Sequence, residues 1–150
     1  AEGVCFVSTA NIGNEYTATR QLDKALLDRF VIIEMDTLSD EQEHGLLQYM
    51  FPSVNTEDLK KVSSISFLTR SEAKADNPRI GSGISTRTSV EIAGLLFDGF
   101  TIQEAADITL YPQYDNDGGA DSERTFVKQI VQKFMDDGSS DDLFDVEEEN

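Results

Sequence analysis

Residues 30–35, Phe30-Val31-Ile32-Ile33-Glu34-Met35, form an apolar and largely β-branched run of the length expected for a buried strand. A similar run from Gly3 to Thr9 leads into polar Asn11 and Gly13. Between the two runs, apolar residues recur at helical spacing over residues 22–30. The order strand, loop, helix, strand predicts that residues 1–36 form an α/β layer with a parallel sheet.

From residue 37 onward the pattern becomes helical. A loop is expected over Ala75–Ser85, which contains Pro78, Gly81 and Gly83. A single helix is expected over Ile102–Leu110, and a last amphipathic helix carries Phe126 to Phe134. The expected helix starts are marked by residues that favour N-caps: Ser39 or Asp40, Asn55 or Thr56, Ser85, and Thr101. The sequence therefore predicts an all-α bundle over residues 37–135.

The charge is strongly acidic and unevenly distributed. The 150 residues contain 12 basic and 29 acidic side chains, for a net charge of −17. Eight of the acidic residues, and no basic one, lie in residues 136–150, which we expect to be a disordered acidic tail. The body still has 21 acids against 12 bases. Because nucleic-acid backbones are bound by clustered Lys and Arg, general nucleic-acid binding is disfavoured.

Several kinds of site lack the residues they need. Cys5 is the single cysteine, which excludes an internal disulfide, and its apolar neighbours predict a buried thiol in a reducing cytoplasm. His44 is the single histidine and is expected at the surface, so we predict neither a catalytic histidine nor a metal site. The acidic stretch Asp115–Glu123 departs from the EF-hand pattern and is expected to be a solvated loop. No apolar run in the sequence approaches the length of about 20 residues that a membrane-spanning helix needs.

Four polar residues occupy positions where ligands are often bound. Asn11 follows a predicted strand, Arg20 precedes the first predicted helix, and Arg29 closes that helix. Arg87 lies in the first turn of a helix, where a cation opposes the helix dipole at a cost of roughly 0.3–1 kcal/mol unless an anion is near. A solvated arginine in a salt bridge, and an Asn that bonds its own backbone, remain open alternatives.

These segments, in this order, resemble the C-terminal half of an AAA+ ATPase module, in particular the MoxR-like and cobaltochelatase small-subunit-like group. Phe6-Val7-Ser8-Thr9-Ala10-Asn11 is similar to the strand that ends in the sensor 1 residue. Residues 20–30, which end in Asp28-Arg29-Phe30, resemble the segment that carries the arginine finger. Ile84-Ser85-Thr86-Arg87-Thr88-Ser89 resembles the start of the lid helix with the sensor 2 arginine. The resemblance covers roughly residues 3–135.

The resemblance implies a role for each of these residues. Asn11 would orient the attacking water, and Arg29 would act on the nucleotide of the neighbouring subunit. Arg87 would contact the phosphates of its own subunit's ATP, and Arg20 is a second candidate for the contact between subunits. Residues 1–36 would be the end of the nucleotide-binding core, with its last two strands and the helix between them, and residues 37–135 would be the helical lid.

The resemblance also implies cofactors and partners. ATP and Mg²⁺ would be bound mainly by residues that this chain lacks, because no Gly-Lys dipeptide is present and the phosphate-binding P-loop requires one. The chain alone should therefore be inactive and belong to a longer polypeptide. The longer protein would form a ring of six copies that remodels a protein substrate or binds an adaptor. The alternative is a non-enzymatic helical interaction domain whose acidic tail, with Leu143-Phe144-Asp145-Val146, docks onto a partner.

Overall fold

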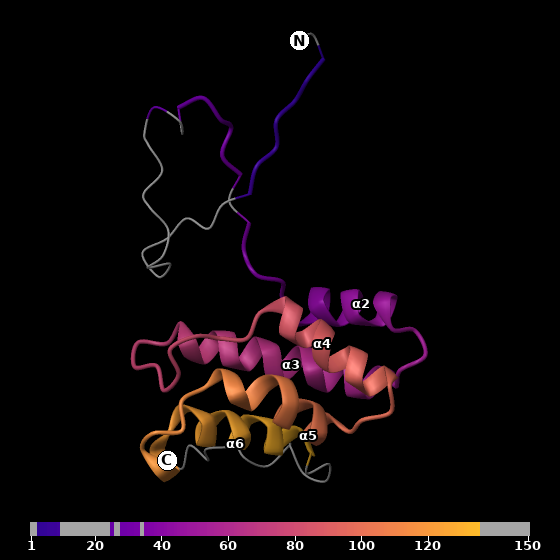
Figure 1. Cartoon of the computed structure of the whole chain (residues 1–150), viewed down its shortest axis with the longest axis vertical. Coiled ribbons are helices and arrows are strands. Elements are labelled where there is room, and N and C mark those ends of the chain that lie inside the picture. Colours follow the sequence, from indigo (N-terminus) through magenta and orange to yellow (C-terminus); the bar gives the residue numbers. More distant parts are fainter. Residues whose placement is uncertain (1–2, 10–24, 26–27, 34, 136–150) are drawn as a thin grey trace, which may run out of the picture. The chain divides into compact units, whose positions relative to one another are not determined.

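The computed structural model describes residues 3–9, 25, 28–33 and 35–135 (Figure 1). The chain divides into two units, Ala1–Asp36 and Thr37–Asn150, and each is described by itself. The predicted acidic tail, residues 136–150, lies outside the described residues.

In the first unit, the predicted α/β remnant is wrong. None of its described residues is in a strand, and the apolar side chains of both runs are exposed, with Val7 at 89% and Val31 at 91%. Cys5 is exposed as well, so the predicted buried thiol is also wrong. The physical reason is that a strand is stable only when a neighbour accepts its backbone hydrogen bonds and covers its apolar face. The described residues of this unit provide neither.

The second unit is helical. No helix in the described ranges is long and apolar enough to cross a membrane. The elements, in chain order, are the α-helices α2 (Asp40–Met50), α3 (Thr56–Ala73), α4 (Thr86–Phe97) and α5 (Ile102–Ala105), a π-helical turn (Ala106–Leu110), two 3₁₀ turns (Tyr111–Gln113 and Gly119–Asp121) and α6 (Glu123–Met135).

The helices start at the residues that the sequence marks as caps. Ser39 and Gln42 form a capping box at the start of α2, in which each side chain bonds the other's backbone amide. Asn55 caps α3, and its Oδ1 accepts the amide of Glu57 at 2.8 Å. Thr101 caps α5 in a second capping box. Local hydrogen bonds therefore explain where these helices begin.

The predicted helix over Ile102–Leu110 is only partly α-helical. It changes to π-helical hydrogen bonding at Ala106. At this change the hydroxyl of Thr109 donates to the carbonyl of Ala105 at 2.8 Å, a bond that competes with the helix ladder. Pro112 follows in the next turn and has no amide proton to continue the ladder.

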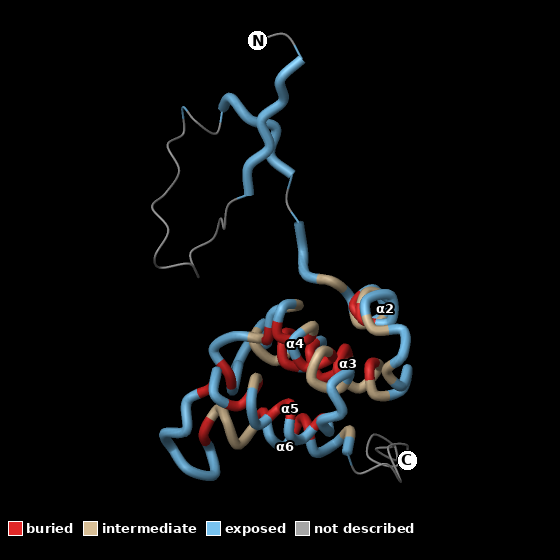
Figure 2. Tube along the Cα trace, turned by 45° about the vertical axis from the view of Figure 1, so that its right-hand side comes forward, coloured by how far each residue is buried: buried red, intermediate tan, exposed pale blue. Residues whose placement is uncertain are grey.

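Helix α3 lies at the centre of this unit and packs against α2, α4 and α6 (Figure 1). Buried residues follow the sides of α3, α4 and α5 that face one another (Figure 2). The core is built mainly from aliphatic side chains, among them Leu47, Leu59, Val62, Ile65, Ile92, Leu110, Val127 and Val131. The helical unit therefore has a hydrophobic core of its own.

A polar contact also joins α2 to α3. The carboxylate of Asp40 accepts hydrogen bonds from Lys60 at 2.8 Å, from Ser63 at 2.5 Å and from Ser64 at 3.1 Å. Partial burial raises the pKa of this carboxyl group, but the three hydrogen bonds and the charge of Lys60 outweigh burial and lower it overall. The contact is therefore made by the ionised form of Asp40.

Candidate functional site at the start of helix α4

The four predicted site residues differ in what the structure describes. Asn11 and Arg20 lie outside the described residues, so their roles stay predictions. Arg29 belongs to the first unit and is exposed in a turn. Arg87 belongs to the second unit, where it is exposed at the second position of α4. Arg87 is therefore the predicted site residue that the structure places on a helix of the second unit.

The first turn of α4 is electrostatically positive. Ser85 caps it, and its Oγ accepts the amide of Thr88 at 3.3 Å. The amides of Thr86 and Arg87, at the first two helical positions, are among those that an α-helix leaves without an internal acceptor. Helices α2 and α3 both have acidic side chains in their first turns, whereas α4 has none. The positive end of the α4 dipole therefore has no acidic side chain of its own first turn to balance it.

Arg87 adds a full positive charge to this helix end. Within residues 35–135, its side chain makes no hydrogen bond and no ion pair. A cation at a helix N-terminus is unfavourable by roughly 0.3–1 kcal/mol. A bound anion would reverse that penalty, because it would contact both the guanidinium and the backbone amides.

Beneath this helix start lies a buried ion pair between Arg70 of α3 and Glu43 of α2. Their side chains are 8% and 0% exposed, and two bonds join them, from Nη1 to Oε2 at 2.5 Å and from Nη2 to Oε1 at 3.1 Å. The hydroxyl of Ser66 also donates to Glu43 Oε1 at 3.0 Å and lies 2.9 Å from the hydroxyl of Ser89 in α4. The polar network therefore links α2, α3 and α4 inside the core.

The same arginine fixes the segment that leads into α4. Arg70 Nε donates to the carbonyl of Ile84 at 2.7 Å, and Arg70 Nη2 donates to the Thr86 hydroxyl at 3.4 Å. The amide of Ile84 donates to the hydroxyl of Thr69 at 3.3 Å. Gly83 lies so close to α3 that a Cβ there would be 2.5 Å from Arg70 Cα. The backbone from residue 83 to 86 is therefore seated directly on α3.

Residues 81 and 82, which precede this segment, are bonded to residues near the C-terminal end of the unit. Tyr114 donates its hydroxyl proton to the carbonyl of Ser82 at 3.0 Å, and Glu123 accepts the amide of Gly81 at 2.6 Å. Burial, together with the negative charge of Glu123, raises the pKa of Tyr114 to about 12. Tyr114 therefore stays protonated and keeps donating at neutral pH.

An arginine in the outer part of the loop is paired, in contrast to Arg87. Arg79 Nε donates to Glu72 Oε1 at 3.1 Å, and the Arg79 guanidinium lies 3.7 Å from the ring centroid of Phe126. The contacts of Arg79 add to those already described at Gly81, Ser82, Ile84 and Thr86, so the loop is held at several points. The backbone that leads to Arg87 is therefore fixed in position.

Glu43 and Arg70 are not among the predicted site residues, although the sequence contains a signal for each. Glu43 lies four residues before buried Leu47, so the two share one helix face. Arg70 lies four residues after buried Ser66 and shares its face in the same way. Two opposite charges placed on apolar faces of consecutive helices suggest a buried ion pair, but only the packing of α2 on α3 makes them partners.

Two other predictions are tested by the described residues. His44 was expected at the surface but is partly buried, and its Nε2 has no hydrogen-bond partner among the described residues. In the acidic stretch, Asp115 accepts the amide of Asp117 at 2.9 Å in a local turn, and Glu123 bonds Gly81 as described above. No group of three or more His, Cys, Asp or Glu side chains in the described part of the chain is placed to hold a metal ion.

Comparison with known proteins gives one informative similarity. No protein-family model matches the chain. The chain is 31% identical over 110 residues, or 73% of its length, to a protein of Thauera aromatica named "Putative chaperone BssE". These residues span 36% of that protein, so this chain corresponds to about a third of its length. The similarity is to a protein with a chaperone name and does not extend to a specific activity.

Proposed function

We propose that this chain is part of an ATP-hydrolysing AAA+ ring protein of the MoxR-like group that remodels a protein partner. The observation that carries the proposal is the exposed, unpaired Arg87 at a helix start that a buried ion pair holds in place. Similarity to a protein with a chaperone name agrees with a protein partner.

In this proposal Arg87 contacts the phosphates of ATP bound to its own subunit. The geometry fits a phosphate, because the guanidinium and the free first-turn amides of α4 both donate hydrogen bonds to anions. Residues beyond this chain would hold most of the ATP and the Mg²⁺ ion, since no P-loop sequence is present. ATP, when bound with Mg²⁺, supplies the phosphoryl group that is transferred to water.

The remaining predicted residues would act around the same phosphate. Arg29 would stabilise the negative charge that develops on the nucleotide of the neighbouring subunit, and Asn11 would orient the attacking water. Arg20 would be a second candidate for the contact between subunits. In comparable enzymes, an arginine supplied by a neighbouring subunit raises the rate of hydrolysis by about 10³–10⁵-fold.

The test uses the complete protein that contains this chain together with a P-loop. Arg29→Ala should still bind ATP but lose most of its hydrolysis, and Arg87→Ala should weaken nucleotide binding or turnover. Lys133→Ala is a matched control, because it removes an exposed cation from the last turn of α6 and should leave both unchanged. ATP hydrolysis that is unaffected by both arginine substitutions would refute the roles given to Arg29 and Arg87. A complete protein that does not hydrolyse ATP would refute the proposal and favour the non-enzymatic interaction domain.

A further inference from the structure

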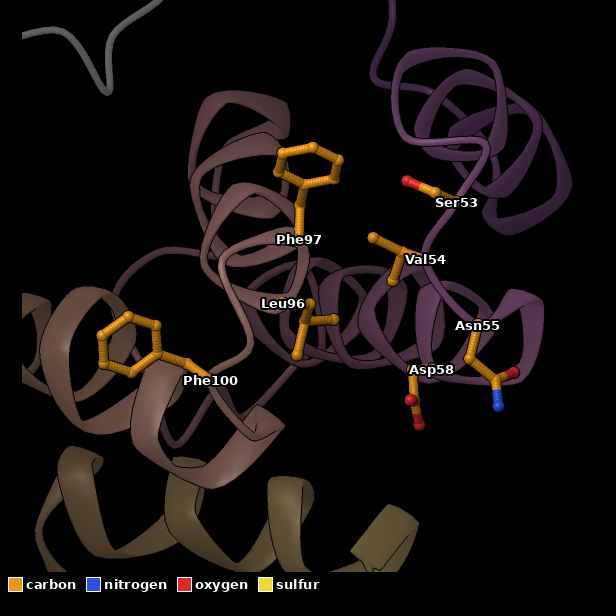
Figure 3. Close-up of a pocket in the computed structure, with 7 residues that line it drawn as sticks. All are labelled: Ser53, Val54, Asn55, Asp58, Leu96, Phe97 and Phe100. Atoms are coloured by element: carbon orange, nitrogen blue, oxygen red, sulfur yellow. The ribbon is translucent and has the colours of Figure 1, made fainter.

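A groove on the helical unit lies at the far end of α4 from Arg87. It has a volume of about 390 Å³ and lies between the start of α3 and the end of α4 (Figure 3). Its lining residues are Ser53, Val54, Asn55, Asp58, Leu96, Phe97 and Phe100. The residues assigned to ATP are not among them, so the groove is separate from the proposed nucleotide contact.

The groove wall on the α4 side is apolar and remains accessible. Phe97 is 60% exposed and Phe100 is 42% exposed. Phe97 packs against Phe51, with the two ring centroids 6.3 Å apart and an angle of 47° between the ring planes. Aromatic side chains, Phe among them, are enriched at protein interfaces relative to the rest of the surface.

Apart from Val54, the opposite wall is polar, and its charge is negative. Asp58 is the one charged residue that lines the groove, and Figure 3 places it beside Asn55 across from Leu96. Asp98, which directly follows Phe97, is exposed as well. No basic side chain lines the groove. An occupant should therefore combine an apolar side chain with a positive charge.

This charge argues against two occupants from the protein itself. The segment 136–150 contains apolar Leu143, Phe144 and Val146, but it carries eight acidic residues and no basic one, so Asp58 and Asp98 would repel it. A second copy of the chain has 29 acidic and 12 basic residues and a net charge of −17, which disfavours close association between copies.

We infer that this groove binds an amphipathic helical segment of a partner protein that presents an apolar side chain flanked by Lys or Arg. The apolar side chain enters beside Val54 and Leu96, with Phe97 on its outer side and Phe100 at the edge of the groove. A basic side chain one helical turn away reaches Asp58. Helices bind grooves in this way through apolar anchors spaced three or four residues apart.

The test measures binding of a defined peptide to the 150-residue chain by fluorescence anisotropy. The probe is a labelled helical peptide of Leu, Lys and Ala with Leu at helical spacing, and the comparison peptide has Glu in place of each Lys. Ionic strength is kept at about 0.15 M, so that long-range attraction between the Lys peptide and the acidic protein is screened. The Lys peptide should bind, and the Glu peptide should bind at least about tenfold more weakly.

Variants with matched controls locate the binding. Phe97→Ser and Phe100→Ser should each weaken binding of the Lys peptide by about tenfold or more, and Asp58→Asn should weaken it by several-fold. Ile108→Ser removes an equally exposed apolar side chain (55%) outside the groove, and Asp107→Asn removes an exposed acid there. Both controls should bind as the unaltered chain does. Four of the five substituted side chains are exposed and Asp58 is partly exposed, and circular dichroism should show unchanged helix content.

Other outcomes would overturn the inference. Equal weakening by groove and control variants would mean that the peptide binds by general attraction alone. A dimer in sedimentation experiments that Phe97→Ser dissociates would make a second copy the occupant. A gain of tenfold or more in peptide affinity on deletion of residues 136–150 would make the tail the occupant. None of these measurements requires nucleotide, so the inference can fail or stand independently of the proposed ATPase function.

Discussion

Replacing Gly83 by Ala tests whether the start of α4 is fixed by its contact with α3. A Cβ at this position would lie 2.5 Å from Arg70 Cα and 2.7 Å from both Arg70 N and Cγ. Two of these three atoms belong to the backbone of α3, so they cannot rotate away as a side chain could. The backbone of Gly83 does not have a positive φ, so the expected effect is steric and not conformational.

The size of the effect follows from the contacts that must move. Overpacking of this kind typically costs about 1–3 kcal/mol. A shift of the loop away from α3 would also stretch the 2.7 Å bond from Arg70 to the carbonyl of Ile84. Hydrogen bonds to charged groups contribute about 1.5–3 kcal/mol. We therefore expect a loss of about 2–5 kcal/mol in the free energy of unfolding, or a fall in Tm of about 10 °C or more for a domain of about 100 residues.

The assay is urea denaturation followed by far-UV circular dichroism, with Gly45→Ala as the control. Gly45 lies on the exposed face of α2, and a Cβ there would meet nothing within 4 Å. Alanine at Gly45 should raise stability by up to about 1 kcal/mol through helix propensity. Equal stability of Gly83→Ala and the unaltered chain would refute the close seating of this loop on α3.

Two further substitutions test the groups around this loop. Glu43→Gln should lower the free energy of unfolding by about 3–5 kcal/mol in the same urea assay, because it leaves the buried Arg70 charge uncompensated; a double variant with Arg70→Met should recover part of the loss. Tyr114→Phe should remove part of the loss of stability between about pH 10 and pH 12, measured by denaturation across that range. Folded Tyr114 keeps its proton up to about pH 12 whereas the unfolded chain loses it near its ordinary pKa of 10.0, so stability falls as the pH rises through this window.

Local sequence signals located the helix starts well. Ser39, Asn55, Ser85 and Thr101 all accept backbone amides of the helices that they precede. These bonds span two or three residues, so a pattern read along the chain contains both partners. The change to π-helix at Ala106 was not predicted, although Thr109 and Pro112 both weaken the ladder there.

Signals that depend on distant partners were less informative. The runs at residues 3–9 and 30–35 have the composition of buried strands, but composition does not supply the neighbouring strand that one requires. Arg87 could be singled out because its position opposes the helix dipole, a local property. Glu43 and Arg70 are 27 residues apart, and no local rule identifies them as partners.

The sequence alone determined where helices α2 to α5 begin, how the acidic charge is distributed, and that Arg87 stands at a helix start. Each of these properties involves residues a few positions apart or simple composition. Only the tertiary structure decided that Glu43 and Arg70 form a buried pair, that Gly83 abuts α3, and that Phe97 and Phe100 remain exposed beside Asp58. These contacts join residues on different helices, and burial of the shared core sets the distances between them.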